Sequence, residues 1–262
     1  MRRHLILTHG RSGSNFLTNS LNLHPQIVNY GEVLGDWTLP SKLRRVGLLE
    51  NQSLPSYLDQ LYNSKALFYC AQAWSAKQHL IKHKPVNLKR HSAVKSLGIK
   101  EFGIHFQRNG LADYLQDHHD IDVIYLYREN ILDRYISVQS LQRNRVVLSE
   151  SSTTRLAKMT IDIDDMMQSL DVLRGELDYT HQLIASLAPN RVLTIRYEDA
   201  FKDGICLQAM CNQVFQFLGV ETIAEKSQQK KILSRSLEQV IDNFDDFQSA
   251  IHRSQYSNLL AV

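Results

Sequence analysis

The sequence predicts an α/β fold in which a central parallel sheet lies between two layers of helices, a three-layer α/β/α arrangement. Short runs of apolar residues alternate along the chain with longer segments in which apolar residues recur every three or four positions. Short apolar runs are typical of strands buried on both faces, and the longer pattern is typical of amphipathic helices. Strands that alternate with helices form βαβ units, so we expect ligands to bind at the carboxyl ends of parallel strands.

The first predicted unit is a strand, a loop and a helix. Residues 4–8 (His-Leu-Ile-Leu-Thr) are predicted to form a short buried strand, which a glycine-rich loop follows directly. The apolar residues Phe16, Leu17 and Leu21 then begin a helix. Pro25 ends this helix, because proline lacks the N–H group that a continuing helix needs.

The same alternation continues through the rest of the chain. A second strand at 121–127 is followed by a helix at 131–141, and the polar segment 143–154 is predicted to be a mobile surface loop. That segment is too short to link two domains, so residues 1–262 are expected to form a single domain. The remaining predicted elements are a long helix at 163–188, a strand at 191–197, a helix at 206–218 and a last helix at 237–251.

The composition is that of an ordinary globular protein. Of the 262 residues, 43% are hydrophobic and 22% are charged, which excludes a disordered or collagen-like chain. The cysteines Cys70, Cys206 and Cys211 lack any Cys-x-x-Cys spacing, so neither a disulfide framework nor a zinc knuckle is predicted. The apolar runs are too short for a signal peptide or a transmembrane helix, so a cytoplasmic protein is expected.

Charge is distributed unevenly along the chain. The formal net charge of +3 does not by itself indicate nucleic-acid binding, but it suits a small polyanionic ligand. Residues 77–100 contain seven Lys or Arg and no Asp or Glu, which fits either a solvated lysine-rich face or the anion-collecting rim of a site. His79 and His83 in this stretch have the spacing of helical metal ligands, but no third ligand is evident, so no metal site is predicted.

A candidate phosphate-binding loop lies between the first strand and the first helix. Residues 8–15 (Thr-His-Gly-Arg-Ser-Gly-Ser-Asn) place two glycines before a helix N-terminus, where backbone N–H groups bind anions. A kinase or ATPase loop has Lys and then a Mg²⁺-binding hydroxyl after its last glycine, whereas this chain has Ser14 and Asn15. The loop therefore predicts a P-loop-like fold and disfavours magnesium-nucleotide chemistry. A nucleotide kinase and a simple glycine turn are the alternatives.

This loop resembles the phosphosulfate-binding segment of the sulfotransferase superfamily. That segment has the form Arg/Lys-Ser/Thr-Gly-Ser/Thr, which residues 11–14 match, and a second segment has an Arg and a downstream Ser that hold a 3′-phosphate. Arg128 and Ser137 match the second segment with a spacing one residue longer. The resemblance implies 3′-phosphoadenosine-5′-phosphosulfate as the donor, adenosine 3′,5′-bisphosphate as the product and no metal. The donor-binding residues that it implies are Arg11, Ser12, Gly13, Ser14, Asn15, Arg128 and Ser137.

The resemblance is closest to bacterial carbohydrate sulfotransferases of the trehalose-sulfating type. It extends through Glu32 to residues 98–100 (Gly-Ile-Lys), 196–199 (Arg-Tyr-Glu-Asp) and 237–244. It implies in-line transfer of a sulfuryl group to a hydroxyl of a carbohydrate or similar metabolite. A homodimer is possible, and a non-catalytic nucleotide-binding protein is the third alternative beside the kinase.

Three residues are candidates for catalysis. By analogy with phosphoryl transfer, Arg11 is expected to stabilise the charge that grows on the leaving phosphate. Glu32 stands where the resembling carbohydrate enzymes keep a catalytic carboxylate, so it is the expected base for the acceptor hydroxyl. His105 is the rival base, because other branches of the superfamily use a histidine from a middle segment. A hydrogen-bonded core histidine is the other interpretation of His105.

Other residues have two interpretations each. Lys100, at the end of a predicted strand, meets either the sulfuryl group or solvent. Lys231 and Arg235 either approach the donor from the C-terminal side or form a solvated cluster before the last helix. The acceptor walls are expected to come from residues 143–154 and from the segment around Trp37.

Overall fold

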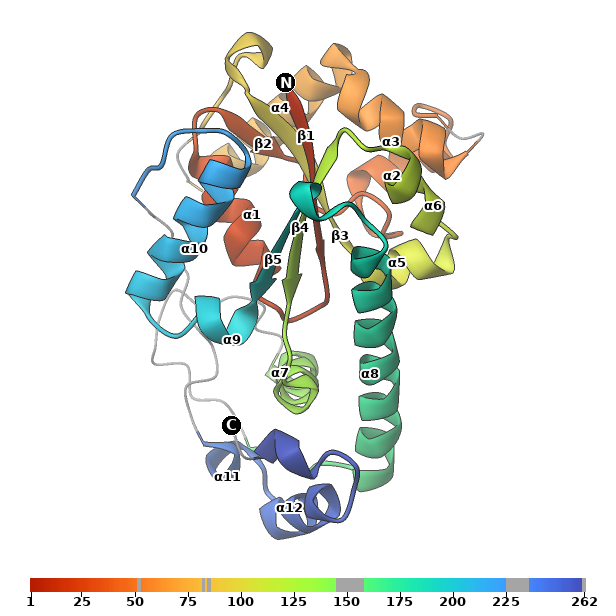
Figure 1. The fold of residues 1–262 in the computed structure, drawn as a ribbon, viewed down its shortest axis with the longest axis vertical. Helices are drawn as coiled ribbons and strands as arrows, with labels where there is room; N and C mark the ends of the chain where they lie inside the picture. Colours follow the sequence, from red (N-terminus) through yellow and green to blue (C-terminus); the bar gives the residue numbers. More distant parts are fainter. Residues whose placement is uncertain (51–52, 82, 84–85, 145–157, 225–235, 261–262) are drawn as a thin grey trace.

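A parallel sheet forms the centre of the fold (Figure 1). The computed structural model of the protein describes residues 1–50, 53–81, 83, 86–144, 158–224 and 236–260. Within these residues the sheet has five strands in the order β2-β3-β1-β4-β5, and every neighbouring pair is parallel. The strands are β1 (Arg2–Thr8), β2 (Ile27–Asn29), β3 (Ser96–Phe102), β4 (Ile121–Tyr127) and β5 (Val192–Arg196). The predicted α/β fold is confirmed.

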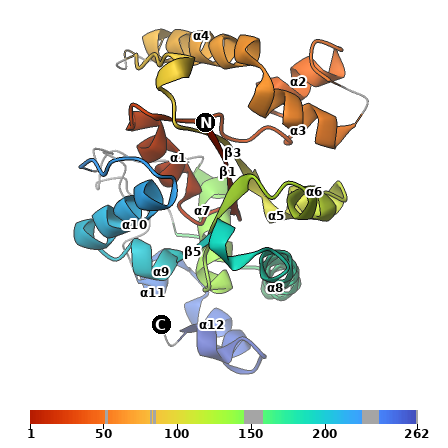
Figure 2. The same cartoon turned by 45° about the horizontal axis from the view of Figure 1, so that its top comes forward.

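Helices cover both faces of this sheet (Figure 2). Helices α1 and α10 lie on one side, and α5, α6 and α8 lie on the other. The α-helices in the described part of the chain are α1 (Ser14–Leu23), α2 (Leu39–Arg45), α3 (Leu54–Asn63), α4 (Lys65–Ile81), α5 (Gly103–Arg108), α6 (Ala112–Asp117), α7 (Ile131–Asn144), α8 (Ile163–Ala185), α9 (Tyr197–Ala200), α10 (Gly204–Phe217), α11 (Leu237–Val240) and α12 (Phe244–His252). Short 3₁₀ helices are η1 (His91–Ala93), η2 (Pro189–Arg191) and η3 (Ser257–Leu260). None of the helices described is long and apolar enough to cross a bilayer.

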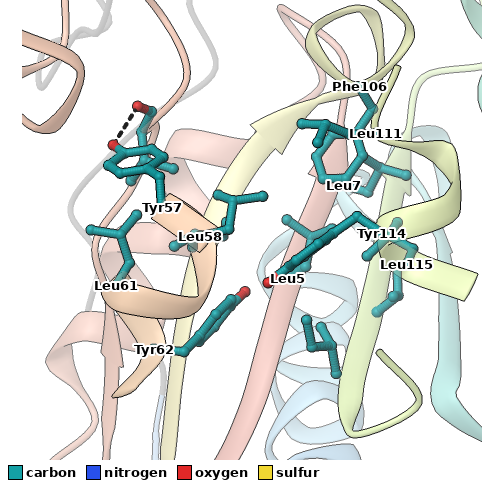
Figure 3. Packing of buried hydrophobic residues seen from close by; sticks show 14 of the residues in the cluster. Leu5, Leu7, Tyr57, Leu58, Leu61, Tyr62, Phe106, Leu111, Tyr114 and Leu115 are labelled. Atoms are coloured by element: carbon teal, nitrogen blue, oxygen red, sulfur yellow. Dashed lines mark hydrogen bonds between the residues drawn. The ribbon is translucent and has the colours of Figure 1, made fainter. Parts of the chain in front are cut away.

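Alternate side chains of β1 enter two separate apolar cores. Leu5 and Leu7 pack with residues of α3, α5 and α6 in one core, which Figure 3 shows from close by. Ile6 packs with residues of α1 and α10 in the other. Successive side chains of a strand point to opposite faces, so a strand that is apolar at every position is stable only when both faces are covered.

Two strands of the sheet were not predicted as such. For β3, the sequence predicted only a strand end at Lys100. The strand in fact spans seven residues and is buried along most of its length. Gly98, Lys100 and Glu101 interrupt the apolar run of β3, so its pattern does not resemble that of a buried strand. Strand β2 has three residues, too few for any periodicity.

The predicted last helix is broken into α11 and α12. Residue Ile241 forms a parallel bridge with Met159, and the N–H of Asp242 donates to the Met159 carbonyl at 2.9 Å. The side chain of Asn243 then bonds both backbone groups of Ile161, at 2.9 and 2.8 Å. These extended contacts with residues 159–161 replace the helical hydrogen bonds that an unbroken helix would make. The prediction of one helix over 237–251 is therefore wrong.

The contact between β1 and β3 depends on a glycine. Gly98 pairs with His4, and a Cβ atom at Gly98 would lie 2.3 Å from the His4 imidazole and 2.4 Å from its carbonyl oxygen. Burial lowers the pKa of His4 to about 3, so the ring is neutral. Its Nδ1–H donates to Ser96 at 2.8 Å, and its Nε2 accepts from the Asn29 amide at 3.0 Å. One imidazole thereby joins β1, β2 and β3.

Replacing Gly98 by Ala is expected to destabilise the protein by about 1–3 kcal/mol or more, because the new methyl group overlaps buried backbone and ring atoms. The matched control is Gly175→Ala in α8, where a Cβ atom meets nothing within 4 Å. That control should gain about 0.5–1 kcal/mol from the helix propensity of Ala. Urea unfolding measures both changes. Equal midpoints for Gly98→Ala and the unmodified protein would contradict the packing described here.

Candidate active site

The phosphate-binding loop, residues 8–15, joins β1 to α1 at the carboxyl edge of the sheet, with residues 9–13 between the two elements. Arg11 and Gly13 have positive φ angles of 66° and 80°, so the loop turns sharply into the helix. Gly13 is the N-cap residue of α1 and has no side chain to cap the helix, which leaves the first N–H groups of α1, those of Ser14 and Asn15 included, for an anion. A Cβ atom at Gly13 would lie 2.4 Å from the Phe201 ring, so the position requires glycine.

Buried hydrogen bonds hold the phosphate-binding loop in place. The fully buried Ser12 hydroxyl donates to the His9 carbonyl at 2.7 Å. From α7, Arg134 donates its Nε–H to the Gly10 carbonyl at 3.0 Å. The Ser12 side chain therefore stabilises the loop, and the backbone N–H of Ser12 is the group that is available to bind a ligand.

Arg11 reaches from the loop to α7. Its Nε–H donates to the Ser137 hydroxyl at 2.9 Å, although the two residues are 126 positions apart in the chain. Burial and the nearby charge of Arg128 lower the pKa of the Arg11 guanidinium. The structure therefore brings together three residues that sequence analysis assigns to donor binding, Arg11, Ser137 and Arg128.

Arg128 lies just beyond the end of β4 and is 7% exposed. Its guanidinium stands over the Tyr197 ring at 4.5 Å, and its Nη2 pairs with Asp133 at 2.7 Å. The Nε atom of Arg128 is buried and has no hydrogen-bond partner among the described residues. Because a buried N–H without an acceptor is costly, this atom fits a site that is completed by an anion.

Lys100 connects Glu32 to the first helix. Its ammonium group donates to Asn15 Oδ1 at 2.9 Å and forms a close ion pair with Glu32 Oε1. The Lys100 side chain is 3% exposed, whereas that of Glu32 is 19% exposed. The second Glu32 oxygen accepts a hydrogen bond from the Trp37 indole at 3.1 Å. Lys100 therefore lies inside the site and not in solvent.

His105 also packs near Trp37, with their ring centroids 5.7 Å apart. The His105 Nδ1 atom lies 2.7 Å from a carboxylate oxygen of the fully buried Glu101, which also accepts the N–H of Leu34 at 2.6 Å and that of Val33. An ionised carboxylate only accepts hydrogen bonds, so Nδ1 carries the proton toward Glu101. The two candidate bases of the sequence analysis, separated by more than seventy residues, thus both contact one indole.

Sequence reasoning missed the structural roles of Glu101, Arg134 and Tyr197. The charge of Glu101 is informative only once β3 is known to be buried, because buried carboxylates are rare unless they are paired. Tyr197 lies in the resembling segment 196–199, but no role was assigned to it, and Arg134 acts through a contact with Gly10, 124 positions away in the chain. Lys231, Arg235 and residues 145–154 of the predicted acceptor loop lie outside the described residues.

His79 and His83 are not part of a metal centre in the described part of the chain. No group of three or more His, Cys, Asp or Glu side chains there is placed to hold a metal ion. His79 belongs to α4, far along the chain from the phosphate-binding loop.

The chain is similar to several solved structures and to a family model. No curated protein matches the sequence. Among solved structures, a sulfotransferase from Alicyclobacillus acidocaldarius is 14% identical with a TM-score of 0.47, and the match covers 100% of this chain and 96% of that one. The sulfotransferase domain of the Synechococcus PCC 7002 olefin synthase is 19% identical with a TM-score of 0.47, covering 98% and 85% of the two chains. The sulfotransferase domain from the curacin biosynthetic pathway is 17% identical with a TM-score of 0.45, covering 90% and 81%.

A family model described as the sulfotransferase domain matches residues 2–251, which is nearly the whole chain. That match includes the phosphate-binding loop, Glu32, the β3 residues and Arg128. On this match, the chain belongs to the sulfotransferase domain family.

Proposed function

We propose that this sulfotransferase uses 3′-phosphoadenosine-5′-phosphosulfate to sulfate a hydroxyl group of a carbohydrate or similar metabolite. Residues 1–262 would form one domain. The sulfuryl group would be transferred by in-line displacement, without a metal. The observation that carries the proposal is the pair of guanidinium groups of the half-buried Arg11 and the buried Arg128, at the carboxyl ends of neighbouring strands. Two cations at this edge suit a ligand with two separate phosphate groups.

The donor would be held by residues of both strands. The N–H groups of Gly13, Ser14 and Asn15, together with Arg11, suit the 5′-phosphosulfate, because a helix N-terminus and a guanidinium both stabilise negative charge. The Nε atom of Arg128, which has no partner among the described residues, suits the 3′-phosphate. The Ser137 hydroxyl, which accepts a hydrogen bond from Arg11, is the second proposed ligand of that phosphate. When bound, this donor supplies the sulfuryl group and a bisphosphate leaving group.

Glu32 is the proposed base, as the trehalose-sulfating branch of the family suggests. Its carboxylate stands between Lys100, which lies inside the site, and Trp37, whose side chain is exposed enough to meet an acceptor. A carboxylate there can take the proton of an attacking hydroxyl. His105 is the rival base, and Glu101 orients its ring. The kinase alternative has no support, because Ser14 stands where a kinase has its lysine.

Adenosine 3′,5′-bisphosphate should bind with a Kd in the micromolar range, and a chelator should leave this affinity unchanged, since the phosphate-binding loop lacks the lysine and hydroxyl of a magnesium-nucleotide site. ATP should bind poorly. Isothermal titration calorimetry with and without magnesium measures both. Magnesium-dependent ATP binding that is tighter than bisphosphate binding would favour the kinase instead.

Arg128→Ala should weaken binding of the bisphosphate by about 10–100-fold and leave the affinity for AMP nearly unchanged, because a charged hydrogen bond to the 3′-phosphate is lost. Ser137→Ala should lose less, as it removes a neutral hydroxyl. Arg196→Ala is the matched control, since Arg196 ends β5 and pairs with Asp199 on the surface. An unchanged ratio of bisphosphate to AMP affinity in Arg128→Ala would mean that the 3′-phosphate lies elsewhere.

Glu32→Gln should lower the turnover number by roughly 10²–10⁴ with bisphosphate affinity nearly constant, because the amide keeps the shape of the carboxylate but cannot accept the proton. The measurement is donor-dependent sulfation across a panel of sugars, glycolipids and small alcohols. His105→Ala is the comparison variant. Should His105→Ala abolish turnover while Glu32→Gln stays active, the base is His105.

A further inference from the structure

The outer face of α4 carries an unusual set of exposed side chains. In this seventeen-residue helix Phe68 is the one buried residue. Tyr69, Trp74, Leu80 and Ile81 are 52%, 44%, 66% and 62% exposed. At about 100° per residue these four fall within an arc of about 140°, so they share one side of the helix. The helix runs along the top edge of the molecule in Figure 2, away from the sheet.

The segment that follows α4 returns beside it and widens this face. The N–H of Lys89 donates to Gln72 of α4 at 3.1 Å, and the N–H of His91 donates to the Tyr69 hydroxyl at 3.4 Å. Leu88, which precedes Lys89, is 64% exposed. We call Tyr69, Trp74, Leu80, Ile81 and Leu88 the α4 surface. Isolated exposed apolar residues are ordinary, but four on one side of a helix, with a fifth in the segment that returns beside it, mark an interaction surface.

Exposed cations lie on and beside this surface. Residues 60–100 contain eight Lys or Arg and no Asp or Glu. Of these, Lys65, Lys77 and Arg90 are exposed on or beside α4, and the Lys77 ammonium stands 5.7 Å from the centre of the Trp74 ring. Lysines among exposed aliphatic and aromatic side chains are the composition of helices that lie in a lipid headgroup region.

We propose that the α4 surface docks this enzyme on an anionic lipid bilayer. The aliphatic side chains Leu80, Ile81 and Leu88 would enter the boundary of the acyl chains, Trp74 and Tyr69 would lie at headgroup depth, and the cations would face anionic headgroups. A nucleic acid offers no apolar region for these aliphatic side chains. A two-fold contact with a second copy would bring together two copies of the same basic surface, with no Asp or Glu from residues 60–100 to pair with the cations. The proposal is independent of the identity of the donor and of the acceptor.

The test is sedimentation of the full chain with vesicles, in which phosphatidylcholine alone is compared with phosphatidylcholine that contains phosphatidylglycerol. We expect binding to the anionic vesicles alone. The pair Leu80→Ser and Ile81→Ser should weaken partitioning roughly tenfold or more, since the buried apolar area is lost. The matched control is the pair Val172→Ser and Ile205→Ser, which are exposed apolar residues of α8 and α10.

Charge is tested by a second pair of variants. Lys65→Gln with Lys77→Gln should weaken anionic-vesicle binding by roughly fivefold for each cation removed. Lys158→Gln with Arg253→Gln, on other exposed parts of the chain, should leave it unchanged. In a Trp37→Phe protein, Trp74 is the single tryptophan. Its fluorescence should shift to shorter wavelength when anionic vesicles are added.

Three results would overturn the proposal. The first is failure to sediment with anionic vesicles while the protein still binds adenosine 3′,5′-bisphosphate, which shows that it is folded. The second is vesicle binding that the Leu80 and Ile81 pair does not weaken. The third is a concentration-dependent dimer, found by analytical ultracentrifugation without lipid, that the same pair abolishes, because the occupant would then be a second copy of the chain.

Discussion

The parallel register of β1 with its two neighbours is the constraint on which the site depends. Thr8, the last residue of β1, pairs with Phe102 of β3 and with Leu126 of β4, so the three strands end at one level. The Thr8 hydroxyl donates to the Leu126 carbonyl at 2.7 Å, which ties the phosphate-binding loop to the strand that delivers Arg128. An antiparallel β3 or β4 would place its functional residues at the opposite edge of the sheet.

Strand β3 positions residues 32–34, the Glu32 segment, through two side chains that point to opposite faces of the sheet. Successive residues of a strand point to opposite faces, so Lys100 and Glu101 diverge. Lys100 pairs with the Glu32 carboxylate, while Glu101 accepts the N–H groups of Val33 and Leu34. A buried charge is costly unless it is paired and hydrogen-bonded, and here each charge is satisfied by the segment that it positions. The segment after β2 is therefore fixed without any regular structure of its own.

Short apolar runs followed by helical patterns were enough to predict the fold class, because β1 contains the run Leu5-Ile6-Leu7, β4 is apolar except at Asp122, and each strand leads into a helix. They were not enough for β3, whose Lys100 and Glu101 are buried only because the Glu32 segment and His105 lie against them. The family resemblance was enough to name the donor-binding residues of the two segments, 11–15 and 128–137. The contact between Arg11 and Ser137, however, depends on the order of the strands in the sheet, which no local sequence pattern encodes. The same limit left Glu32 and His105 as separate alternatives, since no local sequence pattern shows that both contact Trp37.

The basic stretch before β3 shows why charge runs are hard to interpret from sequence. Lys89 is 8% exposed, its ammonium donates to the Asn22 carbonyl at 2.7 Å, and burial lowers its pKa to about 8. Its neighbour Arg90 is exposed, and Lys100 enters the site. The two interpretations of this stretch, a solvated face and an anion-collecting rim, therefore apply to different residues of it. Burial distinguishes the residues of the solvated face from those of the site. It depends on the path of the chain, which returns along α4 and then enters the sheet as β3. Strand β3 lies beside β1, which leads into the phosphate-binding loop.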